Sequence, residues 1–289
     1  MTGLLRADLL KLGKRWMPYV LFVLMLVGAG MLIWAVGYGT WQDQDPEYSA
    51  SGLRTFAYPY SIPALLDSGQ FWGSAIFVGI LTTSTLATEH NWGTIRPALS
   101  GGVSRARYLM SKLILLTLVS AVALLAALGV GVLLSLWATS AAGFDAPVPH
   151  PENFAASDFA LMLGRTALCI VPYGLLAFAL TVVSRSTALG IAGTLGYMTL
   201  EAIIVAALDT GGDFLHGTRV LFVGHNVTAL MAENQFGDLG NESMAFRDLD
   251  APDLPGLWAA TGVIIAECVL LLGVSFAIFA RRDVTVSHG

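Results

Sequence analysis

Six long apolar runs limit what this chain can fold into. They lie at about residues 16–38, 70–88, 109–137, 159–183, 188–208 and 256–280. An α-helix needs about 20 consecutive apolar residues to cross the hydrocarbon core of a bilayer, which is about 30 Å thick. Only 12% of the residues are charged, about half the share found in soluble domains. The sequence therefore predicts an all-α membrane protein with six transmembrane helices.

The cationic side chains are unevenly divided between the segments that join these runs. Most of the 15 lysines and arginines lie before the first run, around the junctions of runs two with three and four with five, or after the last run; these are Arg6, Lys11, Lys14, Arg15, Arg96, Arg105, Arg107, Lys112, Arg185, Arg281 and Arg282. The positive-inside rule places such segments in the cytoplasm. We therefore expect a multi-pass protein of the bacterial inner membrane with both termini cytoplasmic. The net charge of −5 comes from acidic residues on the other side, and it does not indicate nucleic-acid binding.

Residues 1–15 form a predicted amphipathic helix on the cytoplasmic side. One face of this helix carries Leu5, Leu9, Leu12 and Trp16, and the other carries Asp8, Lys11, Lys14 and Arg15. Such a helix can lie as an elbow in the membrane interface, with its apolar stripe in lipid and its cations near anionic headgroups. The alternative is a short solvated segment that only orients the first transmembrane helix.

The segments expected outside the cell differ in length, and residues 209–255 form the largest of them. Within this segment, residues 220–231 are apolar enough for a short helix at the membrane surface but too few to span the bilayer. The chain has no convincing internal repeat, which argues against a secondary transporter built from two related halves. We interpret residues 1–289 as a single transmembrane domain.

Small residues recur along the fifth apolar run at Gly190, Gly193 and Gly196. Helices in a bilayer associate by close approach of their backbones, which small side chains permit. We therefore expect these glycines to lie at helix contacts. A substrate groove could also require small side chains.

Three ionisable residues lie inside the predicted transmembrane helices: Arg165, Glu201 and Glu267. With a rise of 1.5 Å per residue, Arg165 and Glu201 each lie about 10 Å deep on consecutive antiparallel helices, so we expect them to pair. Glu267 lies about 17 Å deep and has no obvious cationic partner at its level. These carboxyl groups could belong to a proton or substrate path, or they could be hydrogen-bonded contacts between helices.

The sequence carries none of the motifs expected of an intramembrane enzyme. It has no His-Glu-x-x-His or Gly-x-Ser-x-Gly motif and no phosphate-binding loop, and its five histidines are scattered without the spacing of a metal site. We therefore expect no catalysis and no cofactor on this chain. If the protein is an active pump, its ATPase lies on another polypeptide.

The cytoplasmic segment 89–108 carries the most specific pattern in the chain. In order along the sequence, the pattern consists of Glu89, Gly93-Thr94-x-Arg96, Leu99, Ser104-Arg105 and Lys112. It resembles a signature of ABC-2-type transporter permeases, in which an acidic residue ends the second span and a lysine opens the third. The resemblance has one gap, since residues 100–103 read Ser-Gly-Gly-Val where that family usually has a proline.

The resemblance implies an ABC-2-type (ABCG-like) permease fold and a transport subunit of a bacterial ABC exporter, similar to permeases for antibiotics, bacteriocins and other hydrophobic or amphipathic compounds. It also implies a second permease copy or homologous permease, and ATP-binding subunits that hold ATP and magnesium. The residues that would couple the permease to these subunits are Glu89, Gly93, Thr94, Arg96, Ser104 and Arg105.

Simple chemistry agrees with a docking role for this segment. Gly93 allows a tight turn, Thr94 can cap a following short helix, and Arg96 can bind a partner's carboxylate through two hydrogen bonds. The alternative is that the arginines are only topogenic contacts with lipid headgroups. Two other functions remain open: an ion-coupled transporter that uses the intramembrane charges, and a non-transporting membrane assembly or sensor protein.

Overall fold

Helices form all the regular secondary structure in the part of the chain that the computed structural model describes, namely residues 2–42, 52–53, 55–68, 75–93, 95–143, 156–209, 217–234 and 254–281. Their order is α1 Thr2–Gly13, α2 Met17–Met31, the π-helix η1 Leu32–Tyr38, α3 Gly39–Trp41, α5 Ser61–Ser68, α6 Ala75–Asn91, α7 Ile95–Ser100, α8 Arg105–Ala141, α9 Ala156–Ser184, α10 Thr187–Asp209, the 3-10 helix η3 Thr218–Leu221, α12 Val223–Ala232 and α13 Leu257–Arg281.

Five of these helical segments are long and apolar enough to cross a membrane: Met17–Trp41, Arg105–Ala141, Ala156–Ser184, Thr187–Leu208 and Leu257–Arg281. Five of the six predicted transmembrane helices therefore correspond to described helices of sufficient length and hydropathy to span a membrane. The second prediction, residues 70–88, corresponds to α6, which begins only at Ala75 and has 17 residues. Part of that prediction, residues 70–74, lies outside the described chain.

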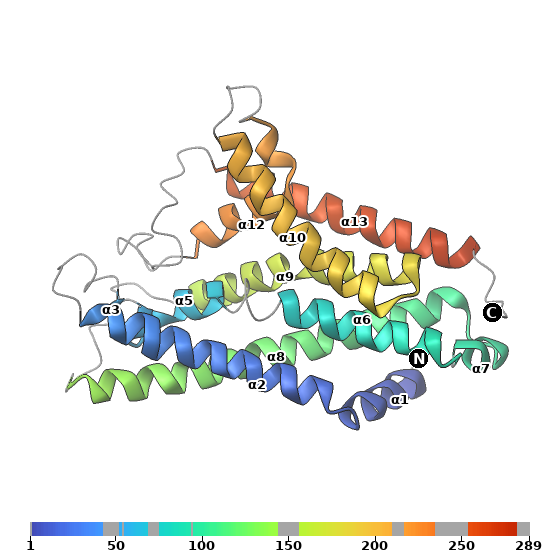
Figure 1. The fold of residues 1–289 in the computed structure, drawn as a ribbon, viewed down its shortest axis with the longest axis horizontal. Helices are drawn as coiled ribbons and strands as arrows, with labels where there is room; N and C mark the ends of the chain where they lie inside the picture. The colour runs from blue at the N-terminus through green and yellow to red at the C-terminus, as the bar shows by residue number, and fades with distance from the viewer. Residues whose placement is uncertain are drawn as a thin grey trace.

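The bundle has two recognisable ends (Figure 1). At one end lie α1, α7 and the C-terminal end of α13; at the other lie α3 and α12. Helix α9 runs through the middle, where it packs against α6, α10, α12 and α13, while α2 packs mainly against α8. The short apolar helix expected near residues 220–231 is present as η3 followed by α12, and α12 packs on α9 and α13 rather than crossing the bundle.

Helix α8 is the longest element, with 37 residues, and it holds the segment around α5 near its C-terminal end. The Ser135 hydroxyl donates a hydrogen bond of 2.6 Å to the carbonyl of Phe56 and lies 2.6 Å from the Ser61 hydroxyl. The backbone amide of Tyr58 donates to the Thr139 hydroxyl over 3.0 Å. These contacts fix α5 and the residues before it to one helix.

The three glycines of α10 differ in their surroundings. A Cβ added to Gly190 would clash with Thr181 of α9 and Thr83 of α6, and one added to Gly193 would lie 2.9 Å from Leu180 of α9. A Cβ on Gly196 would meet no atom within 4 Å. Gly190 therefore lies where three helices approach one another, whereas Gly196 does not.

This difference predicts that Gly190→Val destabilises the bundle and Gly196→Val does not. The added side chain at position 190 must displace two β-branched neighbours, and such overpacking costs about 1–3 kcal/mol. Thermal unfolding of the purified variants in detergent measures the effect, and the two substitutions change helix propensity equally. Equal unfolding temperatures for the two variants would contradict this packing.

Candidate functional site

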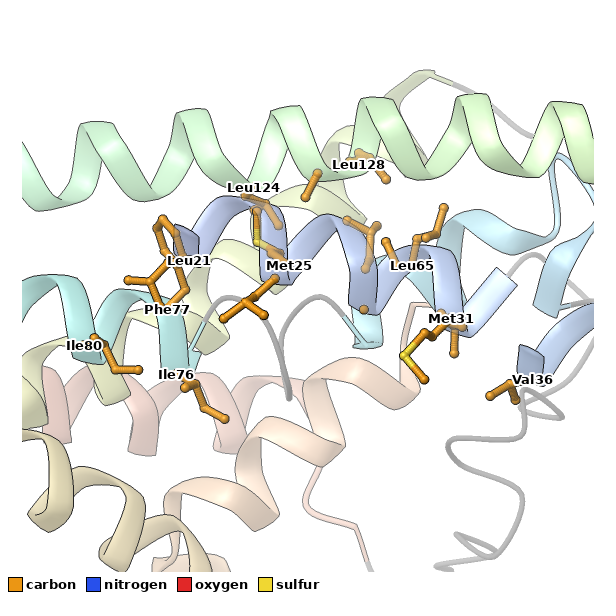
Figure 2. Close-up of a pocket in the computed structure, with 16 residues that line it drawn as sticks. Leu21, Met25, Met31, Val36, Leu65, Ile76, Phe77, Ile80, Leu124 and Leu128 are labelled. Atoms are coloured by element: carbon orange, nitrogen blue, oxygen red, sulfur yellow. The ribbon is translucent and has the colours of Figure 1, made fainter. Parts of the chain in front are cut away.

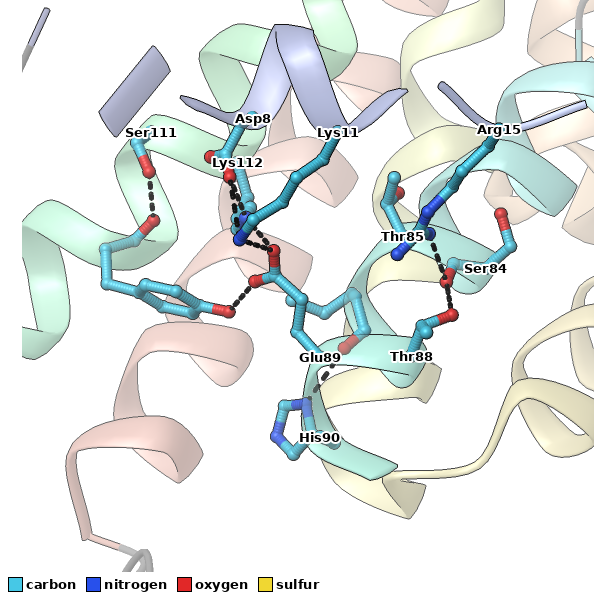
Figure 3. A network of polar contacts seen from close by, with 12 residues as sticks. Asp8, Lys11, Arg15, Ser84, Thr85, Thr88, Glu89, His90, Ser111 and Lys112 are labelled. Carbon is cyan, nitrogen blue, oxygen red and sulfur yellow. Dashed lines mark hydrogen bonds and ion pairs between the residues drawn. The ribbon is translucent and has the colours of Figure 1, made fainter. Parts of the chain in front are cut away.

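The main polar cluster of the described chain lies at the α1 end of the bundle, where Lys112 of α8 sits between two carboxylates (Figure 3). Its Nζ donates hydrogen bonds of 2.7 Å to Asp8 Oδ1 of α1 and of 2.7 Å to Glu89 Oε1 of α6. All three residues are buried, with exposed fractions of 3% for Lys112, 4% for Asp8 and 6% for Glu89. One ammonium group therefore joins three helices. We call these residues, with Lys11 and Tyr108, the buried ion-pair network.

Two further residues complete this network. The hydroxyl of buried Tyr108 donates a hydrogen bond to Glu89 Oε2, and Lys11 Nζ donates one of 3.2 Å to Glu89 Oε1. Lys11 differs from Lys112 because 52% of its side chain is exposed. Glu89 is thus bound on both carboxylate oxygens, whereas Asp8 Oδ2 is buried without a hydrogen-bond partner.

The electrostatics of the network keep Glu89 ionised. Burial alone would raise the pKa of Glu89, but the charge and hydrogen bond of Lys112, with smaller contributions from Tyr108 and Lys11, hold the pKa below its usual value. The buried set carries one positive and two negative groups, so removing Lys112 would leave two carboxylates uncompensated in a low dielectric. The network therefore fixes α1 to α6 and α8 specifically.

Helix α1 buries residues from both of its predicted faces. Asp8 and Leu12 are both buried, while Leu9 is 47% exposed and Trp16 is 77% exposed. The hydrophobic pattern does not predict the burial of Asp8, which depends on a buried lysine of α8 that compensates the cost of burying its charge.

The connection between α6 and α8 is built from two glycine turns around a short helix. Gly93 has φ of 65° and Gly102 has φ of 85°, both in the left-handed region that favours glycine. Between them, α7 carries Arg96 in its first turn. The backbone amide of Arg107 donates to the Ser104 hydroxyl over 3.3 Å, so Ser104 caps the start of α8. Thr94, the predicted cap of the short helix, lies outside the described residues.

Two of the predicted coupling residues are engaged within the chain. Glu89 belongs to the buried ion-pair network and is not on the surface. Arg105 donates a hydrogen bond of 2.6 Å from Nη1 to the carbonyl of Ala280, in the last turn of α13. A cation at this position satisfies a free carbonyl and complements the negative end of the helix dipole.

The predicted pairing of Arg165 with Glu201 is wrong. Arg165 Nη1 donates a hydrogen bond of 2.6 Å to the carbonyl of Glu233, just after α12. The Glu201 carboxylate instead accepts a bond of 2.7 Å from the amide of Gly224, in the first turn of α12, and one of 3.4 Å from the Tyr197 hydroxyl. Both side chains thus hold the short helix α12, which offers backbone donors at one end and acceptors at the other.

Glu267 remains the unexplained charge of the bundle. It lies on α13, and its Oε2 is buried without a hydrogen-bond partner. The described residues contain no group of three or more His, Cys, Asp or Glu side chains that could hold a metal ion. Cys169 is buried in the apolar cluster around α12, and Cys268 packs against the same cluster.

Over the residues that the structure describes, these features define an all-helical protein with five helices able to cross a membrane and an N-terminal helix fixed by a buried ion-pair network. Residues 44–285 match a family model described as "Protein of unknown function (DUF2705)", and the chain belongs to that family. Searches of curated proteins and of solved structures found no match. The matched range includes Glu89, Tyr108 and Lys112, while Asp8 and Lys11 precede it.

Sequence reasoning placed Glu89 and Lys112 in the right segment but missed that they share a site with Asp8. Two signals were available. Tyr108 and Lys112 are four residues apart, so they face the same side of α8. Asp8 is the only acidic residue among the first 15, in a segment with four cations. Their meeting depends on how α1 folds back, which no local pattern encodes.

The network predicts unequal effects of removing its two lysines. Lys112→Met leaves two buried carboxylates without their shared cation and should lower the free energy of unfolding by about 3–5 kcal/mol. Lys11→Met removes a largely exposed ion pair and should cost about 1 kcal/mol or less. Chemical denaturation in detergent gives both values, and trypsin should cleave near Lys14 faster in the Lys112 variant. Similar losses for both variants would contradict the central position of Lys112.

Proposed function

We propose that this chain is the transmembrane permease subunit of an ATP-driven ABC transporter, and that it exports a hydrophobic or amphipathic compound across the bacterial inner membrane. In this proposal the five long helices and α6 are the six spans. The end of the bundle with α1 and α7 faces the cytoplasm. The chain itself catalyses no bond chemistry, and ATP and magnesium are held by the partner subunit.

The observation that supports this proposal best is the way α7 is mounted. It is a short helix between two glycine turns, and it connects α6 to α8. Glu89 lies in the last turn of α6, and Tyr108 and Lys112 lie in the first turns of α8. Those three residues belong to one buried ion-pair network, which also holds α1. A partner that pushes on α7 therefore acts on α1, α6 and α8 together.

These contacts of α7 suggest how ATP-driven movement of a partner subunit would be transmitted to the bundle. When the ATP-binding subunits close, they would displace α7, and the ion-pair network would pass the displacement to three helices as one body. Ile95 of α7 is buried in the same apolar cluster as Leu86, Tyr108 and Phe279, so α7 has little freedom to move alone. Ligand-driven reorientation of the bundle then needs no contact between ATP and this chain.

The proposal predicts that Arg96→Glu and Gly93→Val uncouple the permease from its ATP-binding subunit. Charge reversal turns an attraction to a partner carboxylate into repulsion, and a β-branched residue at the positive φ of Gly93 strains the turn before α7. Matched controls are Arg281→Glu and Gly13→Val, because Arg281 is exposed at the end of α13 and a Cβ on Gly13 meets no atom within 4 Å.

The measurement is affinity purification of each tagged variant in mild detergent, with identification of the copurifying proteins and assay of ATP hydrolysis. We expect an ATP-binding protein with the wild type and both controls, and its loss with both α7-segment variants. An ATP-binding protein that copurifies equally with all five preparations would exclude this segment as the coupling site. If none copurifies with the wild type, the permease proposal itself fails.

The proposed orientation makes a separate prediction. Single cysteines at Gly102 and at Gly256 lie at opposite ends of the bundle on exposed residues, after the native Cys268 and Cys169 are replaced by alanine. In intact cells an impermeant thiol reagent should label the residue at 256 and leave the one at 102 unmodified until the cells are opened. Labelling of position 102 from outside would reverse the assigned orientation.

One observation favours a second candidate, an ion-coupled transporter: the buried and unpartnered Oε2 of Glu267. A carboxyl oxygen without a partner inside a helical bundle is available to a proton or a cation. The two candidates differ in a simple test. Transport by the purified chain in vesicles without any ATP-binding protein, driven by an ion gradient and lost in Glu267→Gln, would support the second candidate and refute the first.

A further inference from the structure

A long apolar groove runs along α2, between this helix and α6 and α8 (Figure 2). Its cavity volume is about 510 Å³, within the range of small-molecule sites in proteins. All sixteen lining residues are apolar; Leu21 and Met25 lie toward one end, and Met31 and Val36 toward the other. None of the titratable groups of the buried ion-pair network lines it.

The groove has a buried floor and an open rim. Phe77 of α6 and Leu128 of α8 are 5% and 7% exposed at the floor, whereas Leu24 and Met31 of α2 are 60% and 62% exposed at the rim. Gly28 of α2 lines the groove, and a Cβ added there would meet no atom within 4 Å. A ligand in the groove would therefore reach the surface of the bundle along α2.

Aromatic residues mark both ends of the helical segment that borders the groove. Trp16 and Tyr19 are exposed where α2 begins, and near the other end Tyr38 packs against both Trp34 and Trp41. Tyr19 and Tyr38 are separated by about 28 Å along the helix axis, close to the thickness of a hydrocarbon core. Trp and Tyr concentrate at both membrane interfaces, so the groove lies at hydrocarbon depth.

The surface beside the end of the groove that carries Leu21 has several cationic side chains. Asp8 and Glu89 are buried and share Lys112, so the charged side chains that α1 and its junction with α2 leave at the surface are all cations, namely Arg6, Lys11, Lys14 and Arg15. Lys14 is exposed, and Arg15 donates a hydrogen bond of 3.4 Å to the carbonyl of Ser84, near the middle of α6. Leu21, the first groove residue, lies about 6 Å along the axis from the start of α2.

We propose that this groove binds one acyl chain of an anionic phospholipid, whose phosphate is held at the α1–α2 junction by Lys14 and Arg15. An apolar cavity of this size does not retain water, and in a bilayer the medium around its open rim is hydrocarbon. The cationic junction selects a negative headgroup, because each lysine or arginine near an anionic surface adds attraction. The proposal rests on the membrane placement given above but is independent of transport and of any ATPase.

The test measures lipid retention by the purified full-length chain with native mass spectrometry, after addition of phosphatidylglycerol or of phosphatidylcholine with the same acyl chains. Gly28→Phe fills the groove, and Gly129→Phe is its control, since Gly129 lies on α8 outside the groove and also has open space around its Cβ. Lys14→Glu reverses a junction charge, and Arg281→Glu makes the same change at the end of α13.

The expected result is preferential retention of phosphatidylglycerol by the wild type, loss of both lipids in Gly28→Phe, and weaker selectivity in Lys14→Glu, by about fivefold per unit of charge. The two controls should match the wild type. Equal retention of both lipids would overturn the headgroup site, and retention unchanged by Gly28→Phe would show a nonspecific lipid shell. A Gly28→Phe variant that alters only the ratio of monomer to dimer would instead make the groove an interface between two copies.

Discussion

The arrangement of the bundle at its α1 end depends on one ammonium group. Lys112 is the buried cation between the carboxylates of Asp8 and Glu89, and these two residues lie 81 positions apart in sequence. Apolar packing alone would let α1 slide along α8, because hydrophobic contacts are not directional. An ion pair with charges at fixed positions removes that freedom. The position of α7, and the surface charge of α1, follow from it.

Most of the fold could be predicted from the sequence because the apolar runs are long and the charges between them are few. Five runs, including residues 109–137 and 256–280, correspond to helices of spanning length, and the short helix near residue 225 is also present. Helix ends were less predictable. α8 extends four residues beyond the predicted run at each end, since Arg105 and Ala141 continue the helix outside any hydrophobic signal.

The polar contacts were predicted less well, for a physical reason. Arg165 and Glu201 have compatible depths and opposite charges, which is all that a sequence shows, yet each binds the backbone of the outer helix α12 and its flank instead. A short helix has unpaired amides at one end and unpaired carbonyls at the other, and these attract charges as effectively as a side chain does. Because these partners are backbone groups, the amino-acid sequence does not reveal them. The burial of Asp8 could not be predicted for a similar reason, because its partner lies on a distant helix.

The length of α8 has a mechanical consequence. Its 37 residues extend about 55 Å without a break, and the helix is attached near one end to Asp8 and Glu89 and near the other to Phe56 and Ser61. A long helix curves gently but kinks sharply only at features such as proline, and α8 contains no proline, so it can carry a displacement from one joint to the other. A tilt of a few degrees at the Lys112 joint would move Ser135, about 35 Å away, by a few ångströms. A movement at one end of the bundle is thus coupled to the other end through the single helix α8.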